Sequence, residues 1–585
     1  MTTLIAQTVR VKQADGRQQL IASSHLRLMV LMLLFIIANG CIGVRLVVLA
    51  IESTNHVQRS AVSAYTPPRA DLLDRDGNLL ARTINVWSIG VHPSKLLNPP
   101  EELAPKLAAL MPERTEAEYL ALLKSHENFT YLQRRASPDL VAQVNALGEP
   151  AMDYVREPQR LYPQTTLAAH VLGYTNIDGH GVTGMERAMD ARLSDPNLRS
   201  QPLMLSINTR VQGVLESELS AGMVKQRARG AAGLVLDART GEVLALVSLP
   251  VFNPNKSGLP TADDPARFNS VVQGVYELGS TFKPLTFANA IETGTVTSLA
   301  KRYDATAPLK VGQFTIHDDE PANRWLNLPE ALVHSSNIVT AQIADMLGEQ
   351  KTRAFFTKLH FDTVPQLELH EKAKPRWPAY WARTSVMTVG YGHGMAVTPL
   401  HLATAYAALV NGGIWRPATL LKLDPKQIPV GERVFSASTS MTMRKMLRLV
   451  VMEGTGERAN VDGMRVGGKT GTAEKAFTVA KTVDPLTGQV ISSAHHGYNH
   501  HANISTFVSA FPMDDPQYIV LTMLDEPHGS ADTGGFSTAG MVSAPIAGKV
   551  IARIGPMLGI LPDPHKDIDV SELTPLLWKP KAERR

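Results

Sequence analysis

The chain has 585 residues, a net charge of +4, 44% hydrophobic residues and one cysteine. This length predicts two or three domains, and the small net charge excludes a polyanion binder, so we expect no nucleic-acid partner. Cys41 cannot form an internal disulfide, and its apolar neighbours give no sign of a reactive thiolate, so we expect neither redox chemistry nor a metal or other cofactor.

The first feature along the chain is an uncharged run over residues 28–44 that continues past Arg45 to Ile51. It is long enough to cross a bilayer, which predicts a cytoplasmic tail at 1–27 and a transmembrane anchor at 28–51. Basic residues precede the run, so the positive-inside rule exports everything after it. A cleaved signal peptide is the alternative, because Val62-Ser63-Ala64 resembles a cleavage site. That site lies well past the apolar run, and we favour a retained anchor.

The next segment contains turn and helix signals but no residue cluster that suggests catalysis or binding. Asp76-Gly77 is a hairpin-turn signal between two short apolar runs. Residues 98–155 have a helical pattern, with helices predicted at 101–111 and 116–124, and we interpret them as a structural insertion. His170 stands alone beside apolar residues, which favours a structural histidine over a catalytic base.

From Pro202 the pattern changes to strands that enclose a helical region. We predict a strand at 203–207, a helix at 210–219, and β-hairpins at 232–247 and 504–524. Strands, then helices, then strands indicate an α+β fold, in which an antiparallel sheet carries helices on both faces.

The helical region opens with Ser280 and Lys283, a hydroxyl and an amine three residues apart. On a helix this spacing brings the amine within hydrogen-bond reach of the hydroxyl, which is how a weak nucleophile is activated. Gly279 permits a tight entry, and Pro284 requires that the helix begin near Ser280, where free amides can bind an oxyanion. By itself the pair is common, and a solvated helix start is the alternative interpretation.

Two later clusters make the pattern specific: Ser335-Ser336-Asn337, and Lys469-Thr470-Gly471-Thr472. Ser-x-x-Lys, Ser-x-Asn and Lys-Thr-Gly in this order resemble the penicillin-recognising serine acyltransferases. The segment from Arg69 to Ala81, the segments around Arg160 and His170, and the run at 389–400 resemble division-specific, FtsI-type class B penicillin-binding proteins. Ala70 and Leu278 replace the usual Gly and Pro of that family.

The resemblance implies the domain order and the localisation. It implies a pedestal (dimerisation-like) domain at 52–205 that contains the 98–155 insertion, a transpeptidase domain at 206–562 and a C-terminal tail at 563–585. The protein would be a single-pass bacterial inner-membrane protein, with its catalytic domain in the periplasm, concentrated at the division septum. The basic stretch at 578–585 predicts a tail without regular structure.

The resemblance also implies the residue roles of a peptidoglycan DD-transpeptidase. Ser280 would attack a stem peptide with release of terminal D-Ala, Lys283 would take its proton, and Ser335 would relay a proton to the leaving group. Asn337 would hold Lys283 and the substrate, Lys469 would supply positive charge, and Thr470, Gly471 and Thr472 would bind the substrate. The amides of Ser280 and Thr472 would form the oxyanion hole. β-Lactams would be inhibitors, and an FtsW-type glycosyltransferase and other division proteins would be partners.

Two alternatives share the motifs: an elongation-type class B transpeptidase and, in a different class, a membrane-anchored β-lactam receptor. Receptors usually have several membrane spans and a cytoplasmic protease, which are not evident here. The histidine-rich tract of His495, His496, His500 and His501 suggests a metal site, but without spaced cysteine or carboxylate partners we favour an exposed polar loop.

Overall fold

The computed structural model describes residues 27–47, 68–256, 264–479, 482–483, 490–492 and 495–578. It divides into two compact units that meet at Pro68 and Arg69. In the first unit, Arg27–Val47 forms an apolar helix long enough to span a membrane. This helix covers most of the predicted anchor, whereas 48–51, the Val62-Ser63-Ala64 site and the end of the basic tail from 579 lie outside the described residues.

The second unit begins with a twisted sheet in the order β3-β2-β1-β5, with β4 also paired to β2. Its strands are β1 (Leu72–Leu73), β2 (Leu79–Val91), β3 (Thr130–Ala136), β4 (Met152–Leu161) and β5 (Leu203–Met204). The predicted turn is confirmed, because Gly77 has a φ of +89° and the Asp74 carboxylate accepts hydrogen bonds from the N–H groups of Asp76 and Asn78. The strand predicted at 203–207 is only the two residues of β5.

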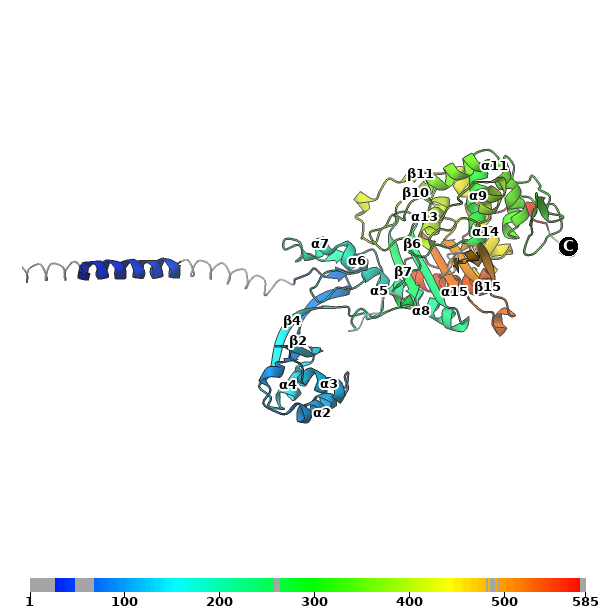
Figure 1. Ribbon diagram of the computed structural model, residues 1–585. Helices are drawn as coiled ribbons and strands as arrows, with labels where there is room; N and C mark the ends of the chain where they lie inside the picture. Colours follow the sequence, from blue (N-terminus) through cyan, green and yellow to red (C-terminus); the bar gives the residue numbers. More distant parts are fainter. Residues whose placement is uncertain are drawn as a thin grey trace, which may run out of the picture. The chain divides into compact units, whose positions relative to one another are not determined.

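A separate small core lies at one end of β2 and β4, where helices α2 (Pro100–Leu110), α3 (Glu116–Leu123) and α4 (Pro138–Asn145) pack together (Figure 1). The prediction of a helical insertion over 98–155 is therefore incomplete, since β3 and the start of β4 also lie in this range. Polar and charged residues interrupt the apolar alternation in β3 (TYLQRRA), and this hid the strand.

Short helices α5 (Ala169–Leu172), α6 (Gly184–Ala188) and α7 (Asp190–Ser194) follow β4. The fully buried Glu186 binds two guanidinium groups: Arg69 Nε at 2.6 Å and Arg160 Nε at 2.7 Å. His170 is buried, and its Nε2 lies 2.8 Å from the carbonyl oxygen of Ala266. Burial lowers the pKa of His170 to about 4, so the neutral imidazole is structural, as predicted.

The large sheet of the second unit has the order β12-β15-β16-β6-β7 in the described residues, with antiparallel neighbours throughout. Its strands are β6 (Gly230–Asp237), β7 (Val243–Leu249), β12 (Gly467–Val479), β15 (His495–Phe511) and β16 (Tyr518–Asp525). Both predicted hairpins are confirmed. Because β12 is an edge strand, one side of it is free to pair with another extended chain.

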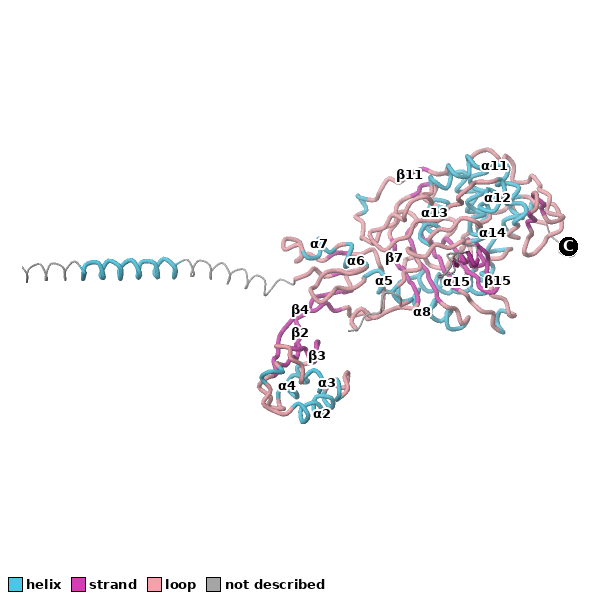
Figure 2. The backbone as a smooth tube through the Cα atoms, in the orientation of Figure 1, coloured by secondary structure: helices cyan, strands magenta, loops and turns pink. Residues whose placement is uncertain are grey.

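Helices cover both faces of this sheet, so the predicted α+β architecture is confirmed (Figure 2). Successive residues of β6 and β16 alternate between two cores, as the period of a strand requires. On one face, α8 (Thr209–Lys225) and α15 (Ala539–Met557) pack against each other and the sheet. The opposite core contains residues of six helices: α9 (Lys283–Glu292), α10 (Leu328–Val333), α11 (Asn337–Lys358), α12 (Arg383–Gly390), α13 (Pro399–Val410) and α14 (Ala437–Glu453).

Within the described ranges, three short strand pairs lie outside the two sheets: β8 (Leu309–Val311) with β9 (Phe314–Ile316), β10 (Ile414–Trp415) with β11 (Glu432–Arg433), and β13 (Thr482–Val483) with β14 (Val490–Ser492). Single-turn 3-10 helices connect other elements: η1 (Pro93–Lys95), η2 (Pro265–Arg267), η3 (Gly279–Phe282), η4 (Pro425–Gln427), η5 (Glu457–Ala459), η6 (Ala531–Thr533) and η7 (Thr574–Leu576). Of these, η3 carries Ser280.

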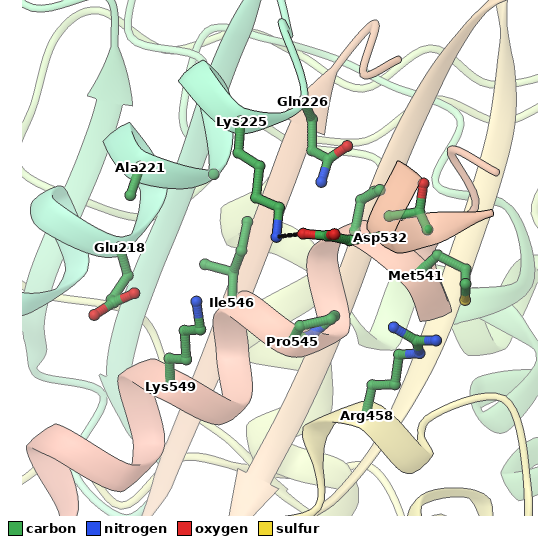
Figure 3. A pocket seen from close by; sticks show the side chains of 13 residues that line it. Glu218, Ala221, Lys225, Gln226, Arg458, Asp532, Met541, Pro545, Ile546 and Lys549 are labelled. Atoms are coloured by element: carbon green, nitrogen blue, oxygen red, sulfur yellow. Dashed lines mark ion pairs between the residues drawn. The ribbon is translucent and has the colours of Figure 1, made fainter. Parts of the chain in front are cut away.

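A cavity of about 210 Å³ opens between α8 and α15 (Figure 3). Its charged lining includes Lys225, whose ammonium pairs with Asp532 at 2.6 Å. The two helices belong to the core that does not contain Phe282, the neighbour of the predicted nucleophile. This cavity is therefore separate from the site that the sequence motifs predict.

Candidate active site

Ser280 lies on η3, which leads directly into α9. The preceding Gly279 has a φ of +54°, a conformation that side chains disfavour, and it makes the sharp entry that the sequence predicted. Lys283 is the first residue of α9 and Pro284 the second, so the proline sits where no intrahelical N–H is needed. Ser280 is partly buried, whereas the predicted partner Lys283 is fully buried.

The Lys283 ammonium group donates hydrogen bonds to the backbone oxygen of Ser335 and, at 3.0 Å, to Ser335 Oγ. Among the described hydrogen bonds, none joins it to Ser280 Oγ, so the direct contact expected from the spacing is not observed. Burial lowers the pKa of Lys283 to about 7, while the carboxylates of Asp319 and Asp318 act in the opposite direction. A neutral amine is thus accessible near neutral pH.

Ser335 joins the two lysines of the site. Its Oγ also accepts a hydrogen bond from Lys469 Nζ at 3.0 Å. The sequence predicted a helical position, but Ser335 lies in the loop between α10 and α11 and has a φ of +58°. This left-handed conformation costs energy in a residue other than glycine, and such strain is typical of functional positions.

The other residues of the second motif have separate tasks. Ser336 caps α11 by accepting a hydrogen bond from the Val339 N–H at 3.1 Å. Asp318 holds this cap, since its carboxylate accepts from Ser336 Oγ at 2.8 Å and from the Ile338 N–H at 2.9 Å. Asn337 donates to the carbonyl oxygen of His317 at 2.9 Å rather than to Lys283, in contrast to the expected contact. No motif in the sequence marked Asp318.

The third motif lies on the edge strand β12. Lys469 is fully buried, and its Nζ donates to Thr470 as well as to Ser335. Burial and the charge of Lys283 lower the pKa of Lys469 well below its usual range, with Asp319 opposing them. Thr470 Oγ1 lies 2.7 Å from the Thr455 hydroxyl, and Thr472 Oγ1 accepts from the backbone N–H of Ala539 at 3.0 Å.

Close backbone packing explains the glycine between the two threonines. A Cβ on Gly471 would overlap the carbonyl oxygen of Leu278, and a Cβ on Gly279 would lie 2.8 Å from the carbonyl oxygen of Thr472. The two glycines therefore let η3 lie directly against β12. This contact brings the backbone at Ser280 and Thr472 together, the two residues predicted for the oxyanion hole.

Four residues beside Ser280 had no predicted role, although Tyr391 and His393 lie in the run at 389–400 that resembles the family. Tyr498 Oη donates to the Glu277 carboxylate at 3.0 Å, and the ring of His393 lies between those of Tyr391 and Tyr498, at 5.3 and 6.2 Å. Glu277 was visible only as a neighbour of Ser280. No local pattern linked it to Tyr498, which is 221 residues away.

The histidine-rich tract lies on strand β15, so the predicted exposed loop is wrong in its secondary structure. Backbone pairing with β12, for example Val479 with His495, extends the hairpin through this tract. The side chains of His495, His496, His500 and His501 lie outside the described residues. Among the described side chains, no group of three or more histidines, cysteines or carboxylates is arranged to hold a metal ion.

Two family models match the chain. The penicillin binding protein transpeptidase domain matches residues 231–484, and the penicillin-binding protein dimerisation domain matches residues 64–195. The first match contains Ser280, Ser335 and Lys469. The second covers most of the sheet that precedes the large one.

Comparisons with individual proteins agree with these matches. The probable peptidoglycan D,D-transpeptidase FtsI of Caulobacter vibrioides is 39% identical over 84% of this chain and 82% of its own length. The peptidoglycan D,D-transpeptidase FtsI of Escherichia coli is 28% identical over 74% and 73%. The crystal structure of penicillin-binding protein 3 from Mycobacterium tuberculosis, complexed with aztreonam, shares the fold with a TM-score of 0.62, covering 86% of this chain and 99% of that one at 23% identity.

The extent of the Caulobacter match, the two domain models in their order and the three motifs around Ser280 lead to one assignment. The chain belongs to the FtsI-type class B penicillin-binding proteins.

Proposed function

We propose that this protein is a peptidoglycan D,D-transpeptidase that works through an acyl-enzyme on Ser280 and is blocked by β-lactams at the same residue. The observation that carries the proposal is the position of Ser335 Oγ, 3.0 Å from both Lys283 Nζ and Lys469 Nζ, beside the helix entry at Ser280. The relatives named as peptidoglycan D,D-transpeptidases support the substrate class.

In acylation, Ser280 Oγ attacks the carbonyl carbon of the penultimate D-Ala of a stem peptide. The neutral amine of Lys283 takes the hydroxyl proton, which requires its side chain to turn from Ser335 towards Ser280. The C–N bond to the terminal D-Ala then breaks. The leaving nitrogen receives a proton through Ser335, which already accepts hydrogen bonds from both lysines. The products are an ester on Ser280 and free D-Ala.

The edge of β12 is suited to hold the donor peptide. An extended peptide can pair with the free side of the strand, and Thr470 and Thr472 can bind its terminal carboxylate, with Gly471 keeping the strand close to η3. The amides of Ser280 and Thr472 serve as the oxyanion hole. Lys469 acts through its hydrogen bonds to Ser335, and Asn337 contacts the substrate backbone.

The cellular role follows from the family and the apolar helix. With Arg27–Val47 as a membrane anchor and basic residues before it, the catalytic domain faces the periplasm and the N-terminus faces the cytoplasm. We assign the enzyme to septal peptidoglycan synthesis, in keeping with the FtsI relatives, rather than to elongation or to β-lactam sensing. An FtsW-type glycosyltransferase supplies the glycan strands, and the anchor and pedestal bind the division partners.

The test uses the full chain in detergent with a peptide donor that ends in D-Ala-D-Ala. We expect release of D-Ala by the wild-type protein and none by Ser280→Ala. Ser270→Ala serves as a control, because Ser270 is a nearby serine that the mechanism does not use. Equal D-Ala release by the Ser280→Ala variant would refute the proposal.

A further inference from the structure

A carboxylate with only neutral hydrogen-bond donors among the described residues lies beside Ser280. Glu277 is three residues before Ser280, and burial raises the pKa of its carboxyl group, although hydrogen bonds from Tyr498 and the Gly394 N–H act in the opposite direction. Among the described residues, no lysine, arginine or histidine forms an ion pair with it. Glu277 is partly buried, and neutral donors alone compensate its negative charge poorly there, so this position favours a cationic partner.

A row of aromatic side chains begins at the carboxylate with Tyr498. The rings of Tyr391 and His393 are 5.3 Å apart, those of His393 and Tyr498 are 6.2 Å apart, and Tyr498 Oη donates to Glu277 at 3.0 Å. Nδ1 of His393 is buried without a hydrogen-bond partner. A carboxylate next to aromatic faces is a typical environment for an ammonium group.

The histidine does not supply the missing positive charge. Burial, and then the charge of Lys283, lower the pKa of His393, while Asp319 and Glu474 oppose them. The imidazole is therefore neutral at neutral pH. Because the charge of Lys283 affects the pKa of His393, the imidazole lies close enough to interact electrostatically with the Lys283 amine.

Backbone contacts fix the cluster next to the nucleophile. The Gly279 N–H donates to the carbonyl oxygen of Gly392 at 3.2 Å, and a Cβ on Gly392 would overlap the backbone of Gly279. Tyr498 lies opposite Ala476 on β12, four residues after Thr472. The cluster thus adjoins both Ser280 and the strand that we assign to the donor peptide.

We propose that Glu277, together with Tyr391, His393 and Tyr498, binds the ammonium form of the acceptor amine before it attacks the acyl-enzyme. The proposal rests on the transpeptidase function above, because that reaction needs a second substrate that is an amine. Amines of amino acids are protonated in neutral water, so the incoming acceptor is a cation.

The chemistry balances without a further reactant. The bound ammonium gives one proton to the neutral Lys283 amine, and the free amine attacks the ester carbonyl on Ser280. An amide bond forms, the ester C–O bond breaks, and the second proton of the nitrogen passes to Ser280 Oγ. Lys283 then releases its proton to solvent. Glu277 holds the acceptor and is not consumed.

The test compares transfer to an amine with transfer to water. The full-length protein is acylated by a peptidyl thioester donor in the presence of D-alanine or Nα-acetyl-L-lysine amide, which sample an α-amine and an ε-amine. The ratio of amide product to hydrolysed donor is measured for the wild type and for Glu277→Gln. Glu292→Gln is the matched control, since Glu292 is a carboxylate at the far end of α9 that accepts hydrogen bonds from Ser436 and Thr439.

We expect Glu277→Gln to lower the amide-to-hydrolysis ratio by about tenfold or more, the usual effect of losing a charge-assisted contact. Tyr498→Phe keeps the ring and should lower the ratio by about two- to fivefold, so it tests the site even if the first variant fails to fold. Glu292→Gln should leave the ratio unchanged.

An unchanged ratio in either cluster variant, or an equal loss in Glu292→Gln, would overturn the acceptor site. The acceptor-site proposal would also be overturned if the wild-type acyl-enzyme reacted only with water in the presence of either amine. Failure of the thioester to acylate the wild type would instead contradict the proposed function.

Discussion

At the scale of single residues, the site depends on two buried lysines that share one serine hydroxyl. Lys283 and Lys469 both donate to Ser335 Oγ at 3.0 Å, and burial disfavours the charged form of each. Two ammonium groups in one dry site repel each other, so the pair binds fewer protons than two exposed lysines would. In the proposed mechanism, this gives Ser280 a neutral lysine as its base.

The first prediction concerns pH. The lowered pKa of Lys283, about 7, means that its neutral form is scarce below that pH and dominant above it. The rate constant for acylation by a penicillin should therefore rise by about tenfold per pH unit below neutrality and level off above it. Stopped-flow or gel-based acylation rates across this range would reveal the profile. A rate that is independent of pH would contradict the role of Lys283 as base.

The second prediction separates chemistry from stability at Lys469. Lys469→Gln removes a donor to Ser335 and should slow acylation by about ten- to a hundredfold. Because burial already disfavours the ammonium group, the melting temperature should fall little. Acylation rates and thermal melts of the same preparation provide both quantities. If the variant melts early while its acylation rate is retained, Lys469 is a structural residue.

At the scale of elements, one buried network holds the start of the second unit together. Glu186 on α6 binds Arg69, which precedes β1, and Arg160 on β4, while Arg69 also pairs with Asp190 on α7 at 2.6 Å. Elements more than a hundred residues apart thus meet at a single fully buried carboxylate.

The third prediction tests this network. Glu186→Gln leaves the buried Arg160 guanidinium without its charged partner and leaves Arg69 with Asp190 alone, which should lower the free energy of unfolding by about 3 to 5 kcal/mol. Arg82→Gln is the control, because it breaks the exposed pair between Arg82 and Asp71 and should cost at most about 1 kcal/mol. Urea unfolding of both variants measures the difference. An equal loss of unfolding free energy in the two variants would show that burial of the network adds nothing to its contribution to stability.

Sequence patterns identified the helices and strands with clear apolar periodicity and the residues of the three motifs. They did not identify the contacts that these residues make. The hairpins β6–β7 and β15–β16 and the helix α8 follow directly from apolar periodicity and turn residues. The partly polar strand β3 escaped detection because its pairing with β2 depends on residues some 45 positions away. Local patterns contain no information on such distant pairing.

The same limit applies to the candidate site. The order Ser280, Ser335, Lys469 was readable, whereas the left-handed backbone of Ser335 and its shared hydrogen bonds depend on the packing of three separate segments. Asp318 stabilises the cap of α11 from a loop that carries no motif. The link between Glu277 and Tyr498 likewise exists only after β12 and β15 have paired.

At the scale of the whole molecule, the apolar helix and the candidate active site belong to different units of the chain. The Arg27–Val47 helix belongs to the first unit and Ser280 to the second. Ser280 is partly buried and makes no side-chain hydrogen bond among the described contacts, so its replacement by alanine should leave the fold nearly unchanged.

The fourth prediction follows from that separation. In a cell that also carries the intact protein, Ser280→Ala should be dominant negative and cause filamentation, because the inactive copy competes for the same division partners. Inhibition should grow with expression of the variant and disappear when residues 27–47 are replaced by an unrelated membrane span. Microscopy with quantitative immunoblotting measures both effects. Normal division in cells with abundant variant protein at the septum would refute this prediction. Swollen cells without filaments would instead favour an elongation-type enzyme.

The most direct measurement of the central claim is the site of acylation. The purified full-length chain is incubated with a penicillin, and intact mass spectrometry followed by peptide mapping locates the adduct. We predict one adduct per chain on Ser280, and no adduct on the Ser280→Ala variant when that variant keeps the wild-type melting temperature. An adduct on Ser335, on Ser336 or on the folded Ser280→Ala protein would contradict the account.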